Sequence, residues 1–567
     1  MKGTRLTFSL GQYEAAVKSC LNNLQQDRIV ERIWEQDYTV WKPSPDNIIN
    51  RLGWLNAPAD TLKKIQYIRS EIVPIINSGI KDVVLLGMGG SSLAAEVFKD
   101  VFGSTADCPT LRILDTTDPA TIAAVTASLN PDKTLFIVSS KSGTTLEVNS
   151  LFQYFYNLLL KKSKTRARGL FLFITDEGSP MIKLAGEVSS LPIFLNNPAI
   201  GGRYSALSLP GIVPAAIIGV DVEKLLQNAV SVMLREKTHK SSGNLDDTGT
   251  ALGATLGTLA QMGRDKLTLI MPSRFASFGN WLEQLIAEST GKEGKRILPV
   301  TGESLSEPGA YGNDRVFVIF PDGDEDSSPK IASLAAAGHP VITIKSDDIY
   351  ELGAQMFIWE MATAVAAYIL KINPFDQPDV EATKVLTSKM IAMYREERAL
   401  PQEEPSLLTP ELSIYGGSKA ATPAEALHDF LTQAKEGAYV SIQAYLSRAP
   451  QMDEALQQLK TAINRKYRLA VTVGYGPCYL HSTGQLHKGD AGNSLFIQLT
   501  ADDFLDLDIP DRIGSDKSSL TFGTLKAAQA LGDRQALIEL GRKVIRFHFA
   551  KNATAHIKIL ANSMTIL

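Results

Sequence analysis

The stretch VVLLGMGGSSLAAEVF, residues 83–98, decides the fold, because an apolar run enters a glycine-rich turn and then a segment of helical period. Glycines let the backbone approach a ligand, and the amides that begin the following helix favour an anion. A tight turn that only serves packing is a second explanation of these glycines, beside an anion site. A dinucleotide site is a third interpretation, because Asp115 ends the next predicted strand. The spacing GxGG, in place of GxGxxG, weakens the dinucleotide interpretation. The turn residues predicted to contact a substrate are Gly89, Gly90 and Ser91.

A second turn, in TLFIVSSKSGTTLEV at residues 134–148, carries more hydroxyl groups than a helix cap requires. In a parallel sheet this turn lies at the same edge as the glycine-rich turn, near the change of strand order. Hydroxyl groups and helix N-terminal amides can together bind a phosphate dianion without a metal. The sequence therefore predicts a phosphate site made by Ser140, Lys141, Ser142, Thr144 and Thr145.

Around these turns, short apolar runs alternate with segments of helical period, which is typical of an α/β fold with parallel sheets covered on both faces. The predicted strands are 82–86, 111–114, 134–138, 169–174, 267–271, 315–320, 340–344, 439–444, 468–473, 495–499 and 556–559. The predicted organisation is a helical segment at 1–80, α/β domains at 81–200 and 201–395, a proline-rich linker at 396–425 and a further α/β unit at 426–567.

Charge and cysteine content argue against several classes of function. With 57 basic and 61 acidic residues, the net charge of −4 gives no electrostatic reason to expect nucleic acid or an anionic membrane as the partner. The three cysteines lie far apart in the sequence, so we expect no disulfide framework, and a cytoplasmic location fits. The longest apolar runs are too short or too interrupted to span a bilayer. No residues have the spacing of metal ligands, and we expect neither a metal nor a cofactor.

The two turns resemble those of the sugar-isomerase (SIS) phosphosugar-binding domain. Three further segments resemble phosphoglucose isomerases in the order in which that family carries them, and the resemblance covers most of residues 80–385. These segments are NPAIGGRYSALS at 197–208, FGNWLEQLIAESTGKEGK at 278–295 and NPFDQPDVEATK at 373–384. The resemblance is greatest to the isomerase portion of transaldolase/glucose-6-phosphate isomerase fusion proteins. It implies two SIS-type three-layer α/β/α sandwiches behind the helical N-terminal segment, with the C-terminal α/β unit in addition.

The resemblance also implies roles for three residues. Glu288, in the E-S-x-G-K motif, would be the base that moves a proton between two sugar carbons, and Arg203 would stabilise the enediolate. From the residues alone, a solvated glutamate and a surface salt bridge are the preferred explanations, and only the resemblance reverses this. Lys384 would assist ring opening, although Asp379 stands in that segment where the family usually has glycine.

The ring-opening histidine is missing from its expected place. The family carries it after the catalytic glutamate, but ILPVTGESLSEPGAYGNDRVF at 297–317 has no histidine, and Asp314 or its neighbours occupy the position. The missing pattern occurs far downstream, in YLHSTGQLHKG at 479–489, where His481 matches. In family dimers the partner subunit supplies this histidine. We therefore hypothesise that the C-terminal unit supplies His481 across a domain boundary, in a chain that works as a monomer or homodimer.

The predicted function is reversible isomerisation of glucose 6-phosphate and fructose 6-phosphate through an enediol(ate), with a small sugar phosphate as the partner molecule. One alternative is an enzyme that also acts on mannose 6-phosphate. Another is a non-catalytic phosphosugar sensor, against which the complete Glu288 and Arg203 motifs argue. An oxidoreductase is a more distant interpretation, because it leaves the hydroxyl-rich turn unexplained.

Overall fold

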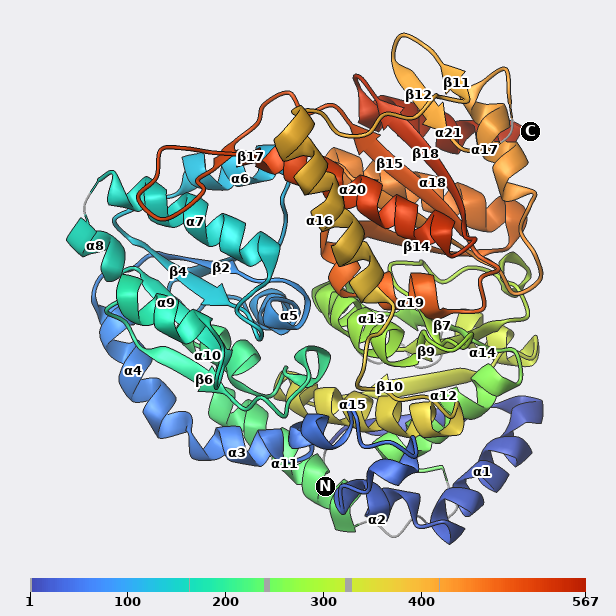
Figure 1. Cartoon of the computed structure of the whole chain (residues 1–567). Helices are drawn as coiled ribbons and strands as arrows, with labels where there is room; N and C mark the ends of the chain where they lie inside the picture. Colours follow the sequence, from blue (N-terminus) through green and yellow to red (C-terminus); the bar gives the residue numbers. More distant parts are fainter. Residues whose placement is uncertain (1–2, 163, 239–244, 322–328, 418, 567) are drawn as a thin grey trace.

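The computed structural model describes residues 3–162, 164–238, 245–321, 329–417 and 419–566 of the chain. Its strands form two five-stranded sheets, one six-stranded sheet and one short two-stranded ribbon. In Figure 1 the first sheet, the second sheet and the C-terminal sheet surround a central region, and helix α13 lies close to its middle. The α/β class predicted from the alternating pattern is confirmed.

The first sheet has the strand order β3-β2-β4-β5-β6, and every neighbouring pair is parallel. The three inner strands, β2, β4 and β5, are largely apolar and buried on both faces, as a parallel sheet between two helix layers requires. Both turns that were singled out follow adjacent strands, β2 and β4, so they lie side by side at one edge. The elements are β2 (Asp82–Leu86), α5 (Leu93–Phe102), β3 (Thr110–Leu114), α6 (Pro119–Ser128), β4 (Thr134–Ser139), α7 (Leu146–Leu160), α8 (Lys164–Arg168), β5 (Phe171–Asp176), α9 (Met181–Val188) and β6 (Ile193–Asn196).

The second sheet has the order β1-β10-β9-β7-β8 and is parallel except at its edge. That edge strand, β1 (Arg5–Ser9), pairs antiparallel with β10 from within the segment predicted to be wholly helical, so that prediction is wrong there. A strand of five residues whose partner lies more than 300 residues away has no hairpin turn beside it, so the local sequence does not reveal it. The elements are α10 (Leu209–Ile217), α11 (Val222–Thr238), α12 (Gly249–Gln261), β7 (Lys266–Ile270), α13 (Ala276–Thr290), β8 (Leu298–Val300), β9 (Arg315–Ile319), α14 (Pro329–Ala336), β10 (Val341–Lys345) and α15 (Leu352–Ile369).

The rest of the N-terminal segment is helical and wraps the second domain along the lower edge of Figure 1. Its α-helices are α1 (Glu14–Gln26), α2 (Ile29–Trp34), α3 (Ala57–Lys63) and α4 (Ile65–Asn77). One stretch, Ile349–Ile369, is long and apolar enough to cross a membrane, but 94% of it is buried inside the protein. Its position matches that of a core helix, since it packs against α11, α12 and α13.

The C-terminal sheet has the order β11-β12-β18-β15-β13-β14. Two of its strands, β11 and β12, lie within 396–425, so part of the predicted linker is built into this sheet. The strand predicted at 556–559 is wrong, because those residues belong to helix α21. The elements are α16 (Val380–Glu397), β11 (Leu407–Leu408), β12 (Leu412–Tyr415), α17 (Pro423–Leu431), β13 (Tyr439–Tyr445), α18 (Pro450–Tyr467), β14 (Ala470–Tyr475), α19 (Gly484–Gly489), β15 (Leu495–Ala501), β16 (Asp508–Ile509), β17 (Leu520–Thr521), α20 (Phe522–Glu539), β18 (Lys543–Phe549) and α21 (Ala553–Ile566).

The C-terminal unit is docked on the second domain through a buried apolar cluster that both parts share. Arg296 of the second domain also reaches Asp490 of the C-terminal unit at 2.7 Å, and both side chains are buried. Such a contact stabilises one relative position of the two parts, since separating it would expose both charges and the apolar surface. The cluster consists of Ala287, Leu298, Val300, Tyr439, Ala470, Leu486, Phe496, Leu537 and Val544.

Gly291, the residue at which α13 ends, makes this docking possible. Its φ of −82° is open to any residue. A Cβ at Gly291 would lie 2.3 Å from the Cα of Leu486 in α19, a distance too short for any real contact. The glycine therefore permits the C-terminal unit to lie directly on the end of α13.

Gly291→Ala is expected to lower the free energy of unfolding by about 1–3 kcal/mol, the usual cost of overpacking a filled interface. Gly309→Ala is the matched control, because a Cβ at Gly309 meets nothing within 4 Å. Urea unfolding of the two variants beside the parent chain measures the difference. Equal midpoints for both variants would contradict the close docking of α19.

Candidate active site

The centre of the site is a buried ion pair between Arg203 and Glu288. Arg203 lies in a short 3-10 helix (η6, Gly202–Tyr204) after the first domain, and Glu288 lies near the end of α13. Nη1 of Arg203 is 3.2 Å from Oε2 of Glu288, and only 4% and 5% of the two residues are exposed. The surface interpretations of these residues are therefore excluded, and a buried carboxylate lies beside a fixed positive charge.

Arg203 also binds the segment that follows the second domain. Its Nη2 donates to the carbonyl oxygens of Pro374 at 2.7 Å and Asp376 at 2.8 Å, and its Nη1 donates to Oε1 of Gln377 at 3.3 Å. Its Nε donates to Oγ of Ser289 at 2.9 Å. The three segments 197–208, 278–295 and 373–384, which are far apart in the sequence, therefore meet on one guanidinium group.

Burial raises the pKa of Glu288 above its ordinary value, and the nearby charges of Arg203 and His481 only partly oppose this shift. Lys292, one turn further along, is also buried and donates to the carbonyl oxygen of Asp376 at 2.6 Å. Burial, with the charge of Arg203, lowers the pKa of Lys292 to about 8. A carboxylate with a raised pKa beside two cations suits a base that must accept and return a proton.

His481 reaches this site from the C-terminal unit. It ends the 3-10 helix η11 (Cys478–His481), and its backbone carbonyl accepts a hydrogen bond of 2.7 Å from Nε2 of Gln284, one helical turn before Glu288. Its ring nitrogen Nε2 lies 3.0 Å from Oε1 of Glu147 in the first domain. By contrast, Asp314, in the place where the family carries its histidine, is paired with Lys266 at 3.2 Å.

Two opposing effects set the charge of His481. Burial alone would lower the pKa of the imidazole, but the charge and hydrogen bond of Glu147, with the charge of Glu288, raise it overall. Conversely, burial would raise the pKa of the Glu147 carboxyl, and the pairing with His481 lowers it overall. The pair therefore favours a protonated imidazole held by an ionised carboxylate, which is a proton donor in a fixed orientation.

The hydroxyl-rich turn immediately precedes Glu147. Ser140 Oγ accepts a hydrogen bond from the amide of Gly143 at 3.1 Å and lies 3.0 Å from Thr145 Oγ1. Ser142 and Thr144 are exposed, and Thr145 occupies the cap position of α7 without a side-chain cap bond. The hydroxyl groups are thus not used up in capping, and the turn opens toward solvent. Lys141 bonds to Asp176 and to the carbonyl oxygen of Pro198 at 2.9 Å.

The glycine-rich turn crosses the segment that carries Arg203. A Cβ at Gly90 would lie 2.0 Å from the carbonyl oxygen of Gly202, so only glycine allows the two backbones to meet. A Cβ at Gly89 would lie 2.7 Å from the carbonyl oxygen of His481. Gly89, Gly90 and Ser91 form a 3-10 turn (η5), and they fix the position of Arg203 and His481 as well as bordering the site.

Lys384 lies at the edge of this arrangement. Its side chain is 57% exposed and pairs with Glu381 at 3.3 Å on the first turns of α16. Its charge nevertheless contributes to lowering the pKa of His481, which places it on the His481 side of the site. The structure thus gives Lys384 no direct contact with Glu288 or Arg203 among the described interactions.

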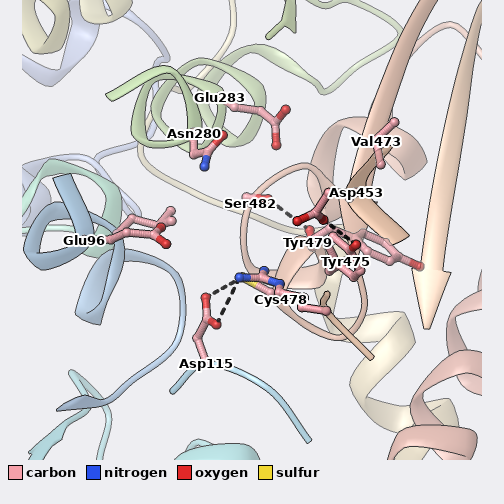
Figure 2. A pocket seen from close by; sticks show the side chains of 13 residues that line it. Glu96, Asp115, Asn280, Glu283, Asp453, Val473, Tyr475, Cys478, Tyr479 and Ser482 are labelled. Atoms are coloured by element: carbon pink, nitrogen blue, oxygen red, sulfur yellow. Dashed lines mark hydrogen bonds and ion pairs between the residues drawn. The ribbon is translucent and has the colours of Figure 1, made fainter. Parts of the chain in front are cut away.

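A separate cavity of about 280 Å³ lies behind the turn that carries His481. Figure 2 shows Asn280 and Glu283 of α13 on one side of it and Glu96 and Asp115 of the first domain on another. Cys478, Tyr479 and Ser482, the neighbours of His481, form a further wall. None of the predicted site residues lines this cavity, so it is distinct from the Arg203–Glu288 centre.

Several residues of the arrangement were missed by the sequence analysis, notably Glu147, Gln284, Lys292 and Gln377. Glu147 follows the hydroxyl-rich turn in the first turn of α7, and Gln284 precedes Glu288 by four residues on the same helix face. Once roles are given to the hydroxyl-rich turn and to Glu288, the positions of Glu147 and Gln284 beside them can be recognised in the sequence. Within residues 3–566, apart from the undescribed gaps, no three His, Cys, Asp or Glu side chains gather as a metal site would require.

The chain is similar in sequence to known proteins. Residues 57–314 match the model of the family described as phosphoglucose isomerase. A glucose-6-phosphate isomerase of Campylobacter jejuni is 28% identical over 363 residues, which cover 55% of this chain and 86% of that protein. One of Leptospira biflexa is 29% identical over 386 residues, or 59% and 84% of the two chains.

Solved structures show the same fold. A hypothetical protein of Thermus thermophilus superposes with a TM-score of 0.58 at 24% identity, over 69% of this chain and all of that one. A glucose-6-phosphate isomerase of Chlamydia trachomatis superposes with a TM-score of 0.58 at 18% identity, over 70% of this chain and 90% of that one. Through residues 57–314, this chain is therefore similar to the phosphoglucose isomerase family, and its fold is that of the two solved structures.

Proposed function

We propose that this chain interconverts fructose 6-phosphate and glucose 6-phosphate through an enediol(ate), as the names of its relatives suggest. The observation that carries the proposal is the buried Arg203–Glu288 pair with His481 beside it. A desolvated carboxylate, a fixed cation and an oriented imidazole are the groups that this reaction needs.

In the direction from the ketose, Glu288 takes a proton from C1 of the open-chain sugar. The electron pair of that C–H bond forms the C1–C2 double bond, and the carbonyl oxygen at C2 becomes anionic beside Arg203. Glu288 then returns the proton to C2, while the hydroxyl proton at O1 moves to O2 and leaves an aldehyde at C1. Atoms and electrons balance without any added oxidant, reductant or metal.

His481 opens the sugar ring before this step. A protonated imidazole donates to the ring oxygen as the bond to the anomeric carbon breaks, and Glu147 holds the imidazole in position for it. The anomeric hydroxyl gives its proton to water as the carbonyl forms, and the positive charge of Lys384, on the same side, stabilises the negative charge that develops on that oxygen. In this proposal the C-terminal unit is part of the catalytic machinery.

The phosphate group of the sugar binds at the turn after β4. The proposed contacts are the hydroxyl groups and amides of that turn, with Lys141 nearby and the glycine-rich turn bordering the sugar. The exposure of Ser142 and Thr144 supports this placement, because a phosphate needs access to their hydroxyl groups. The phosphate contacts proposed are Ser140, Lys141, Ser142, Thr144 and Thr145, and the sugar borders Gly89, Gly90 and Ser91.

We further propose that one chain holds a complete site, so that a monomer is active and any homodimer has two independent sites. The docking of the C-terminal unit on α13 supports this, since it brings His481 to Glu288 within the chain. A cytoplasmic location is proposed as well, supported by three cysteines that are all free.

The test is a coupled assay of the purified chain with fructose 6-phosphate in the presence of a chelator. Formation of glucose 6-phosphate at a chelator-independent rate is the expected result. Turnover of mannose 6-phosphate at a comparable rate would make the enzyme bifunctional. Binding of the sugar phosphate without any turnover would contradict the proposal and favour a phosphosugar sensor.

The dependence of kcat/KM on pH is expected to be bell-shaped. Glu288 must be ionised to accept a proton, and its pKa is raised, so activity falls as the pH drops through a value above 4.5. His481 must be protonated to open the ring, and its pKa is raised, so activity falls as the pH rises through a value above 6.5.

Glu147→Gln identifies the alkaline limb of this profile. It removes the carboxylate that raises the pKa of His481, so the alkaline midpoint is expected to move to lower pH while the acid midpoint stays in place. An alkaline midpoint that is the same in the variant and the parent chain would assign that limb to another group.

A further inference from the structure

A second residue of the C-terminal unit, Gln529 of α20, reaches the ring-opening pair. Its Nε2 donates to Oε1 of Glu147 at 2.7 Å, and this is the same oxygen that lies 3.0 Å from Nε2 of His481. Only 3% of Gln529 is exposed. One carboxylate oxygen of the first domain is thus held by two side chains that come from different elements of the C-terminal unit.

The orientation of the Gln529 amide is fixed at both ends. Its Oε1 accepts a hydrogen bond from Oγ1 of Thr117 at 2.8 Å, and an ionised carboxylate can only accept, so the NH2 end faces Glu147. Thr117 is itself fully buried, at the end of the β3 turn. The chain Thr117–Gln529–Glu147–His481 therefore crosses repeatedly between the first domain and the C-terminal unit, and the Glu147 carboxylate accepts from both of its neighbours.

The rest of α20 holds the other side of the site. A Cβ at Gly532 would lie 2.7 Å from Oγ1 of Thr387 in α16, the helix that carries Lys384. Asp533 Oδ1 accepts from Nζ of Lys488 at 2.6 Å and Oδ2 accepts from the hydroxyl of Tyr479 at 2.6 Å, which anchors η11 and α19. In Figure 1, α20 and α16 lie side by side. The helix that carries Gln529 is therefore held in place by α16 on one side and by η11 and α19 on another.

We propose that Gln529 is a positioning residue for ring opening, acting through Glu147 to hold His481 protonated and correctly aimed. The inference rests on the proposed isomerase function. A donor to Glu147 stabilises its ionised form and prevents its rotation away from the imidazole. The charged groups that face His481 are Glu147 on α7, Glu288 on α13 and Lys384 on α16. Of these, Glu147 is the one that Gln529 controls.

The test separates ring opening from proton transfer by using two substrates. Fructose 6-phosphate must be opened, whereas 5-deoxyfructose 6-phosphate lacks the hydroxyl that closes the ketose ring and stays open. Exchange of its C1 hydrogen with deuterium in D2O, followed by NMR, reports Glu288 alone. Gln529→Leu is expected to lower kcat on fructose 6-phosphate about tenfold or more and to leave the exchange rate within about twofold.

Gln529→Glu supplies a rescue that depends on pH. Two carboxyl groups this close share one proton, and the protonated group donates to Glu147 as the amide did. The ratio of variant to parent kcat on fructose 6-phosphate is therefore expected to be near one at low pH and to fall about tenfold as the shared proton leaves. A residue that only fills space gives a ratio that does not vary with pH.

Gln535→Leu is the matched control, because Gln535 lies on the same helix and bonds only to Glu539 at 2.9 Å in an exposed position. It is expected to behave as the parent chain on both substrates. Equal losses on both substrates in Gln529→Leu, no loss at all, or a pH-independent ratio in Gln529→Glu would overturn the proposal. If Gln529→Leu does not fold, the pH dependence of Gln529→Glu decides alone.

A measurement on the substrate-free chain can test the role of Gln529 even if the chain proves not to be an isomerase. The NMR titration midpoint of the His481 ring in the substrate-free chain is expected to move in Gln529→Leu and to stay in Gln535→Leu. A parent chain that does not isomerise fructose 6-phosphate, but whose His481 midpoint responds to Gln529, contradicts the function and not the contact. An unmoved His481 midpoint in an active enzyme contradicts the positioning role.

Discussion

Glu288→Gln is expected to lower kcat for fructose 6-phosphate by about a thousandfold, within the range that general-base catalysis contributes. Glutamine has the shape of glutamate, and its carbonyl oxygen can still accept the bond from Arg203 at 3.2 Å. It cannot accept a proton from carbon. The loss therefore falls on the chemical step, and KM is expected to change little.

Glu283→Gln is the control for this prediction. Glu283 lies on the same helix as Glu288, and burial raises its pKa to about 7, but it faces the separate cavity behind His481. Above pH 7, where Glu283 is ionised, this substitution removes one negative charge from α13 without touching the Arg203 centre. Turnover by Glu283→Gln is expected to match that of the parent chain.

The exchange of the C1 hydrogen with solvent gives a second measurement on the same variants. If Glu288 is the base, Glu288→Gln loses exchange and isomerisation in equal proportion, because both begin with the same proton transfer. A variant that keeps more than a tenth of either rate assigns the base to another residue. Lys292, buried beside Glu288 with its pKa lowered to about 8, is then the next group to test.

The first sheet could be predicted because its signals are local. Each strand from β2 to β5 is a short, mainly apolar run, and each is followed by a turn and a helix of its own. The predicted strands at 82–86, 111–114, 134–138 and 169–174 agree with β2 to β5 within two residues at either end. The edge strand β6 (Ile193–Asn196), only four residues long, was missed.

The errors in the C-terminal unit have a physical cause. The residues at 556–559 alternate in polarity as a strand does, but the buried positions Ile557, Leu560, Ala561 and Met564 recur at the spacing of a helix. The true strand, β18, carries Lys543 and Arg546 among its apolar residues and lies between β12 and β15. A window of four residues cannot distinguish such a helix from a strand, whereas a longer window shows the helical spacing.

In the site, too, residues with a local sequence signal could be predicted, and contacts between distant segments could not. Arg203 and Glu288 stand in motifs whose residues are close in sequence, so their importance could be predicted, although their direct ion pair could not. The contact between Gln529 and Glu147 joins residues that are 382 apart, and α20, which carries Gln529, has no recognisable motif. A glutamine in a regular helix carries no sequence signal for such a role, and only the folded chain brings it to His481.

The second large effect is expected from His481→Ala, which should lower kcat for fructose 6-phosphate about a hundredfold. The imidazole is the only group among the described residues that bonds to Glu147 from η11, and alanine leaves nothing there to protonate the ring oxygen. Exchange on 5-deoxyfructose 6-phosphate is expected to survive, because that sugar needs no opening. His548→Ala, which removes a partly exposed histidine paired with Asp502, is the matched control and should be fully active.

Mixing two inactive variants decides whether the C-terminal unit acts within its own chain. Glu288→Gln and His481→Ala are co-expressed and purified together, so that any dimers formed include some with one chain of each variant. If a partner subunit supplied His481, mixed dimers would contain one site with both residues intact and would recover activity. If each chain supplies its own His481, as the docking of α19 on Gly291 supports, every site lacks one residue and no activity returns. Recovery would mean that this chain works only as a dimer, with the C-terminal unit exchanged between subunits.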